Sequence, residues 1–122
     1  MNDRTRAVSV ETERRKQVDA PPIDMAYLAQ QTLGDNGIAH EVLGLFLIEI
    51  GAAREAMRTD GYTERQEVAH RLKGAARAVG AFALAETAAE IERAPGDDNH
   101  VIMFQTRIGE LESYISVVVG QR

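Results

Sequence analysis

The chain has 122 residues and a mass of 13.4 kDa, the size of one compact domain and too small for two ordinary ones. A content of 44% hydrophobic and 27% charged residues is typical of a soluble globular protein. The net charge of −5 argues against a nucleic-acid binder, and the absence of cysteine excludes disulfide scaffolds, thiol catalysis and Cys-ligated metal sites.

No uninterrupted apolar run reaches the ~20 residues of a membrane span, and residues 1–16 are charged where a signal peptide would be apolar. We therefore expect a cytoplasmic protein that does not bind a membrane. Residues 1–20 carry many charges and few large apolar side chains, and Pro21-Pro22 follow them. This contrast predicts a mobile, charged N-terminal tail over 1–20 and one domain over 21–122. The pattern leaves a helical start over 11–18 open.

Helical patterns follow Pro22. Asp24 is placed to cap a short helix over 25–33, which the Gly-Asp-Asn-Gly turn after it ends. A helix over 38–58 carries an apolar stripe that further large side chains broaden. The stripe consists of Ile38, Val42, Leu45, Ala52 and Ala56, and the broadening side chains are Leu43, Phe46, Leu47 and Ile50.

Thr63 and Gln66 form a weak capping box for a third helix, which runs to Val79 before Gly80. A fourth helix covers 81–93, a turn covers 94–99, and the last helix repeats apolar residues in steps of three and four between Val101 and Val118. No segment alternates with period two over a useful length. The sequence therefore predicts an all-α domain, an antiparallel up-down four-helix bundle with a short extra N-terminal helix.

The third helix has two chemically different sides. Its inward stripe consists of Val68, Leu72, Ala75, Ala76 and Val79. The opposite side carries His70, Lys73, Gly74 and Arg77, so we expect His70 to face solvent. Gly74 is unusual because a glycine on an outer helix face costs about 1 kcal/mol relative to alanine.

An accessible imidazole with cleared space and a cation one turn away suits the transfer of a phosphoryl group to a ring nitrogen. Gly74 provides the space, because a larger side chain there would crowd the ring, and Lys73 provides the cation. The same segment, from His70 through Ala76 to Gly80, resembles the H-x-L-K-G-[SA]-[SA]-x-x-[LIV]-G signature of histidine-containing phosphotransfer (HPt) domains. The resemblance covers about 23–119 and includes the helix with Phe46 before the signature and the helix with Ala88-Ala89-Glu90-Ile91-Glu92 after it.

This resemblance implies that His70 is the phosphoacceptor, that Lys73 stabilises the phosphoryl group, and that Gly74 gives a partner access. It also implies that Gly80 ends the histidine helix, and we expect Arg77 and Gly80 to contribute to partner docking. The implied partners are receiver domains of response regulators and of a hybrid histidine kinase, with Mg²⁺ bound only by those partners. Because the chain has no P-loop and no kinase glycine-rich motif, we expect a phosphoryl carrier without kinase activity, a cofactor or a metal, in the form of a monomer.

Several alternatives remain. The chain could be a helical-bundle adaptor without phosphoryl chemistry, although such a protein has no need of Gly74. His40, His70 and His100 lack the spacing of a local metal-ligand pair, which disfavours a metal-dependent enzyme. Arg77 could be a plain solvated charge. The large apolar side chains of the second helix are most simply core, and the other interpretation makes part of them a docking patch beside His70.

Overall fold

The structure is a computed structural model, and it describes residues 21–58 and 61–120. The predicted charged tail and the possible helix over 11–18 lie outside the described residues. The described residues form five helices and no strand, as an all-α domain requires. The helices are α2 (Met25–Gln31), α3 (Asn36–Ala56), α4 (Tyr62–Val79), α5 (Phe82–Arg93) and α6 (Asp98–Gly120). Each predicted end lies within three residues of the observed one.

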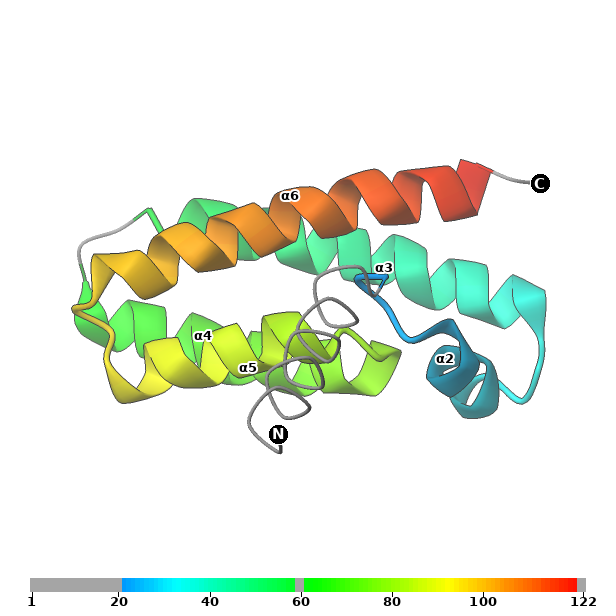
Figure 1. Ribbon diagram of the computed structural model, residues 1–122, viewed down its shortest axis with the longest axis horizontal. Helices are drawn as coiled ribbons and strands as arrows, with labels where there is room; N and C mark the ends of the chain where they lie inside the picture. Colours follow the sequence, from blue (N-terminus) through cyan, green and yellow to red (C-terminus); the bar gives the residue numbers. More distant parts are fainter. Residues whose placement is uncertain (1–20, 59–60, 121–122) are drawn as a thin grey trace, which may run out of the picture.

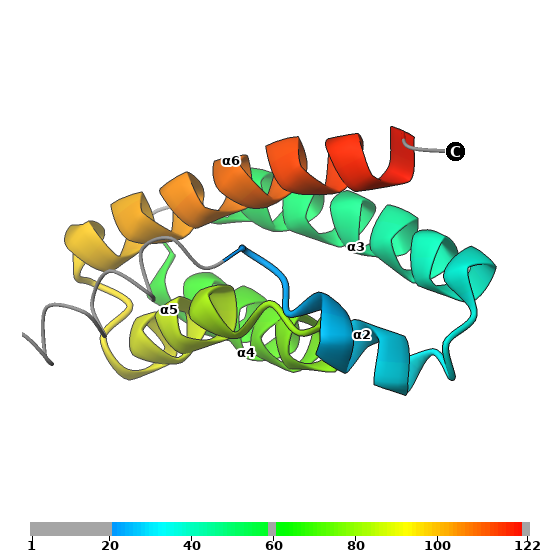
Figure 2. The ribbon, with the colours of Figure 1, turned by 45° about the vertical axis from the view of Figure 1, so that its right-hand side comes forward.

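The four long helices lie side by side and alternate in direction along the molecule (Figure 1). Helix α3 packs against α4 and α6, and α5 packs against the same two helices. Helix α2 contacts α3 and α4 and lies at the end of the molecule where α3 begins and α4 ends (Figure 2). Asp24 caps α2 as predicted, because its carboxylate accepts the backbone N–H of Tyr27 at 3.0 Å.

The hydrophobic core fills the space between the four long helices. Helix α6 contributes one stripe with the predicted spacing, and the largest fully buried side chains come from nearly every element. They are Ile23, Leu28, Leu43, Ile50, Met57, Leu84, Ile91, Phe104, Ile108, Leu111 and Ile115. The buried apolar side chains of α4 are smaller, and they are Ala69, Leu72, Ala76 and Val79. Small side chains let α4 lie close to its neighbours.

Helix α3 buries a different face from the predicted stripe. Its core face is formed by Ala39, Leu43, Phe46, Ile50 and Ala53. In the predicted stripe, Leu45 is 64% and Ile38 is 46% exposed. The helix is apolar around most of its circumference, so the face with the larger contiguous side chains becomes the core because it removes more apolar area from water. The core interpretation is confirmed for Leu43, Phe46 and Ile50, whereas Leu47 is only partly buried.

The predicted capping box at the start of α4 is wrong. The helix begins two residues earlier, at Tyr62, with Gly61 as its N-cap and no side-chain cap bond. Thr63 therefore lies inside the first turn. Gln66 points to another helix, because its side-chain amide donates to the backbone carbonyl of Glu92 in α5 at 3.0 Å.

Gly80 ends α4 as predicted. Its φ of 89° is left-handed, and a Cβ there would lie 3.0 Å from the carbonyl oxygen of Asp24. Both observations require glycine. The carbonyl of Gly80 accepts the N–H of Asp24 at 3.0 Å, which joins the corner between α4 and α5 to the start of α2.

Among the described residues, α3 is the one helix with the length and apolar content of a membrane span. Its sequence is interrupted by Glu41, Glu49 and Arg54. Its core face packs against α4 and α6, as in the central helix of a bundle. One face of α3 is therefore buried in the bundle, and its length and composition alone are weak evidence of a membrane span.

Candidate functional site

The candidate site lies on the seam between α4 and α5. His70 stands in the middle of α4 with its side chain 72% exposed, which confirms that it faces solvent. Its Nδ1 lies 2.9 Å from Oε2 of Glu92, near the end of α5. The two helices run side by side after the tight corner at Gly80, and this brings residues 22 positions apart into contact.

This contact selects one form of the neutral imidazole ring. An ionised carboxylate can only accept a hydrogen bond, so Nδ1 of His70 carries the hydrogen and donates it to Glu92. In the neutral ring Nε2 then holds the lone pair. No hydrogen-bond partner for Nε2 occurs among residues 21–58 and 61–120, and the ring is open to solvent. The exposed nitrogen of His70 is therefore a free nucleophile.

Lys73 binds the second oxygen of the same carboxylate. Its Nζ lies 2.6 Å from Oε1 of Glu92, and its side chain is only 22% exposed. The long side chain of Lys73 lies along the seam toward α5, which keeps its ammonium on the same side of α4 as His70. Lys73 and His70 thus share one carboxylate, which places the ammonium close to the imidazole.

The charges explain why Glu92 stays ionised. The hydrogen bond from Lys73 lowers the pKa of Glu92 below its ordinary value of 4.5; partial burial acts in the opposite direction, and the hydrogen bond from His70 adds to the lowering. At neutral pH the carboxylate is therefore charged and can accept both hydrogen bonds. In the unphosphorylated protein, His70, Glu92 and Lys73 therefore form a connected triad.

Gly74 leaves open space one turn beyond His70. In the part of the chain that the structure describes, a Cβ built on Gly74 meets nothing within 4 Å, so no packing there requires a glycine. The residue is exposed on the outer face of α4. A Cβ at position 74 therefore does not itself crowd the ring of His70, and the role of Gly74 in giving a partner access stays a prediction.

Arg77 and Gly80 lie at the end of α4 in different environments. Arg77 is exposed in the last turn, where a positive charge also favours the helix dipole. Gly80 is buried against Asp24 and Tyr27, so its place is the interior and not the surface around His70. The position of Gly80 fits its helix-ending role.

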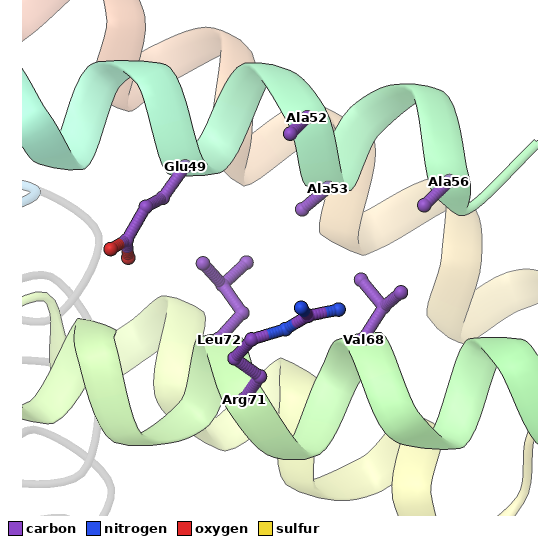
Figure 3. A pocket seen from close by; sticks show the side chains of 7 residues that line it. All are labelled: Glu49, Ala52, Ala53, Ala56, Val68, Arg71 and Leu72. Atoms are coloured by element: carbon purple, nitrogen blue, oxygen red, sulfur yellow. The ribbon is translucent and has the colours of Figure 1, made fainter.

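The other flank of α4 borders an apolar hollow of about 380 Å³ between α3 and α4. In Figure 3, three alanines of α3 face the side chains of α4, with Glu49 at one side and Arg71 directed into the space. The residues that line it are Glu49, Ala52, Ala53, Ala56, Val68, Arg71 and Leu72. Because Arg71 directly follows His70, the hollow adjoins the site across the width of one helix.

The remaining histidines do not join the site. His40 lies on α3, and Nε2 of His100 on α6 lies 3.4 Å from Glu90 and 3.8 Å from Asp97. Within residues 21–58 and 61–120, no three His, Cys, Asp or Glu side chains are grouped as metal ligands.

Glu92 is the site residue to which the sequence alone assigned no role. A signal for it exists, because His70 precedes Ala81 by eleven residues and Glu92 follows Ala81 by eleven. Two antiparallel helices joined at that corner bring such residues to the same level. The sequence does not show which side of α5 faces the ring, and that orientation decides whether a carboxylate or an apolar side chain meets His70.

Comparison with known proteins agrees with this geometry. The Hpt domain family model matches residues 41–119, which span α3 to α6 and more than half of the chain. Searches of curated proteins and of solved structures gave no match. The match covers the helix that carries His70 and Lys73 and the helix that carries Glu92. The members of this family serve in histidine phosphotransfer in phosphorelays and interact with receiver domains. Because the match covers more than half of its residues, the chain belongs to the Hpt domain family.

Proposed function

We propose that this protein is a phosphoryl carrier in a multistep phosphorelay and that His70 is its phosphoacceptor. His70 accepts a phosphoryl group from the aspartyl phosphate of one receiver domain and passes it to the aspartate of a second. The observation that carries this proposal is the hydrogen bond between Nδ1 of His70 and Glu92, because it leaves Nε2 with its lone pair and exposed.

In the forward step, the lone pair of Nε2 attacks the phosphorus atom of the aspartyl phosphate. The N–P bond forms, the bond between phosphorus and the aspartyl oxygen breaks, and the aspartate leaves with that electron pair as a carboxylate. The imidazole ring gains positive charge as the N–P bond forms, and its Nδ1–H becomes a stronger donor. Glu92 already accepts this hydrogen, so it stabilises the charge that develops on the ring.

Lys73 supplies the compensating charge for the phosphoryl group. Its ammonium lies on the same carboxylate as the ring, and we expect its flexible side chain to extend to a group carried on Nε2. A lysine acts here as a mobile point charge, which balances the phosphoryl oxygens without a rigid cage. Return transfer to a second aspartate follows the same path in reverse, and the chain carries no kinase activity of its own.

The exposed apolar side chains of α3 support a docking surface for a receiver domain. Leu45 precedes Glu49 by four residues and Ala52 by seven, so it lies on the same side of α3 as the hollow. Leu45 is 64% and Ile48 is 71% exposed. Apolar contacts there, together with the open space at Gly74, let a receiver cover His70 from the α3 side. Arg77 adds a charge that helps to choose the partner.

The remaining parts of the proposal concern the setting of the site. The arrangement is an antiparallel up-down four-helix bundle, the protein is a cytoplasmic monomer, and Mg²⁺ belongs to the receiver domains. The alternation of helix directions in Figure 1 supports the bundle arrangement, and the accessibility of one histidine on one compact bundle supports the monomer.

The test is phosphoryl transfer followed by intact mass. The protein is mixed with receiver domains preloaded with acetyl phosphate, and a gain of about 80 Da that is lost in acid is expected for the parent chain. His70→Gln should fold normally and gain nothing. His40→Gln and His100→Gln are matched controls, since both residues are histidines away from the seam, and they should take up the group as the parent does.

A parent chain that gains no mass from any receiver of the same genome, while still binding one, would favour the adaptor interpretation. An acid-labile gain that persists in His70→Gln would assign the phosphoacceptor to another residue.

A further inference from the structure

Gln66 forms a bridge between the two helices of the site. It lies on α4 one turn before His70, and its side-chain Nε2 donates to the backbone carbonyl of Glu92 at 3.0 Å. That carbonyl belongs to the last turn of α5, where helix carbonyls lack a partner within their own helix. Gln66 therefore ties the end of α5 to α4.

The hydrogen bond from Gln66 holds Glu92, the residue that orients the imidazole of His70. Gln66, His70 and Lys73 are spaced by four and three residues, so all three project from the same flank of α4. All three side chains contact Glu92. Gln66 contacts the backbone carbonyl of Glu92, and His70 and Lys73 contact its carboxylate. Glu92 is the second-to-last residue of α5, and helix ends fray unless something holds them. Fixing the backbone of Glu92 fixes the place from which its carboxylate reaches the ring.

We propose that Gln66 is a positioning residue of the phosphoacceptor site, which holds the end of α5 so that Glu92 keeps the Nδ1–H form of His70. This inference rests on the proposed function of His70. Without the amide of Gln66, the last turn of α5 moves more freely and the carboxylate leaves Nδ1 for part of the time. The neutral ring then also adopts the form with hydrogen on Nε2, which has no lone pair at the exposed nitrogen.

The molecule contains a matched control for this bond. Gln105 on α6 donates its side-chain Nε2 to the backbone carbonyl of Arg54, in the last turn of α3, at 3.2 Å. The chemistry is the same, a glutamine amide on the end of a neighbouring helix, and none of the contacts of Gln105 involves the triad. The Gln66 bond is exposed and the Gln105 bond is partly buried, so loss of the Gln105 bond should cost at least as much stability. We expect only loss of the Gln66 bond to affect His70.

The experiment compares Gln66→Met, which keeps the length of the side chain without a donor, with Gln105→Met and with Gln66→Lys, which keeps a donor. The deciding measurement is the ¹⁵N chemical shifts of the His70 ring in the unphosphorylated protein at alkaline pH, which report the ratio of the two ring forms. Gln66→Met should lower the share of the Nδ1–H form relative to the other form by about threefold to tenfold, the range expected for the loss of one hydrogen bond. Gln66→Lys should restore it, and Gln105→Met should leave it unchanged.

The rate of phosphoryl transfer from a loaded receiver should fall with the Nδ1–H share in Gln66→Met and stay at the parent value in Gln105→Met. An unchanged ring ratio in Gln66→Met overturns the inference, and so does an unchanged transfer rate in the presence of an active parent protein. If the parent itself accepts no phosphoryl group, the proposed function fails, while the ring ratio still decides whether Gln66 positions Glu92.

Discussion

The two flanks of α4 differ in chemistry. The flank toward α5 is polar and connected, because Glu92 is joined to His70 by a hydrogen bond and to Lys73 by an ion pair. The flank toward α3 is apolar, with alanines around a hollow and exposed leucine and isoleucine side chains next to it. The comparison suggests a division of work on one helix. In the proposed function, residues on the α5 side prepare the ring nitrogen of His70, and residues on the α3 side offer contact area to a receiver domain.

The largest expected difference between the two flanks is a change in the rate of phosphoryl transfer from a receiver domain, caused by a substitution on the apolar flank. Leu45→Glu should slow transfer from a receiver domain about tenfold at subsaturating concentrations, because it places a charge in the proposed contact area. Phosphorylation of the same variant by a small donor such as phosphoramidate should be unchanged, since no docking is needed. Ile102→Glu on α6 is the control, because Ile102 is 63% exposed and Leu45 is 64% exposed. Equal slowing in both variants would remove the α3 side from the docking surface.

The next effect concerns the outer face between the flanks. Gly74→Ala should raise the free energy of unfolding by about 0.5–1 kcal/mol, because alanine favours the helix and its Cβ meets no atom within 4 Å. The same variant should transfer more slowly with a receiver, because the methyl group occupies the space needed for approach. Chemical denaturation and transfer kinetics measure the two effects. Gly51→Ala on α3, where a Cβ also meets nothing within 4 Å, should show the stabilisation alone. Unchanged transfer in Gly74→Ala would contradict the access role.

The smallest effect is the dependence of stability on pH at the polar flank. The folded-state pKa of Glu92 lies below 4.5, so its ion pair stabilises the fold above that pH and the contribution is lost as the pH falls through the folded pKa. The parent should therefore be more stable than Glu92→Gln by about 0.5 kcal/mol at neutral pH, with the difference shrinking below pH 4.5. Urea denaturation of both proteins across this range measures it. If the difference in stability between the parent and Glu92→Gln grew toward acid pH, the assignment of a negative charge to Glu92 would be wrong.

Much of this molecule can be predicted from local sequence signals. The bounds of the helices, the exposure of His70 and the end of α4 at Gly80 depend on periodicity and turn chemistry, which act within a few residues. The resemblance of the segment around His70 to the HPt signature predicts the family that the domain match shows.

The parts that could not be predicted depend on contacts between helices. Leu45 and Leu43 are both apolar, and only the packing of α3 against its neighbours decides which one is buried. Gln66 has the right spacing for a capping box, yet its amide finds a carbonyl of α5, because that helix end lies beside it. Glu92 acquires its role in the same way, since its distance from His70 is set by the α4–α5 corner and not by sequence spacing.

The shared carboxylate has a consequence for how long the phosphoryl group stays. Before phosphorylation, Lys73 is already bound to an anion, so the incoming group must compete with Glu92 for the same ammonium. In the proposed phosphorylated state, Glu92 and the phosphoryl group share the one ammonium of Lys73, so each anion receives only part of its compensating charge. We therefore expect the proposed site to favour rapid relay of the phosphoryl group over its storage.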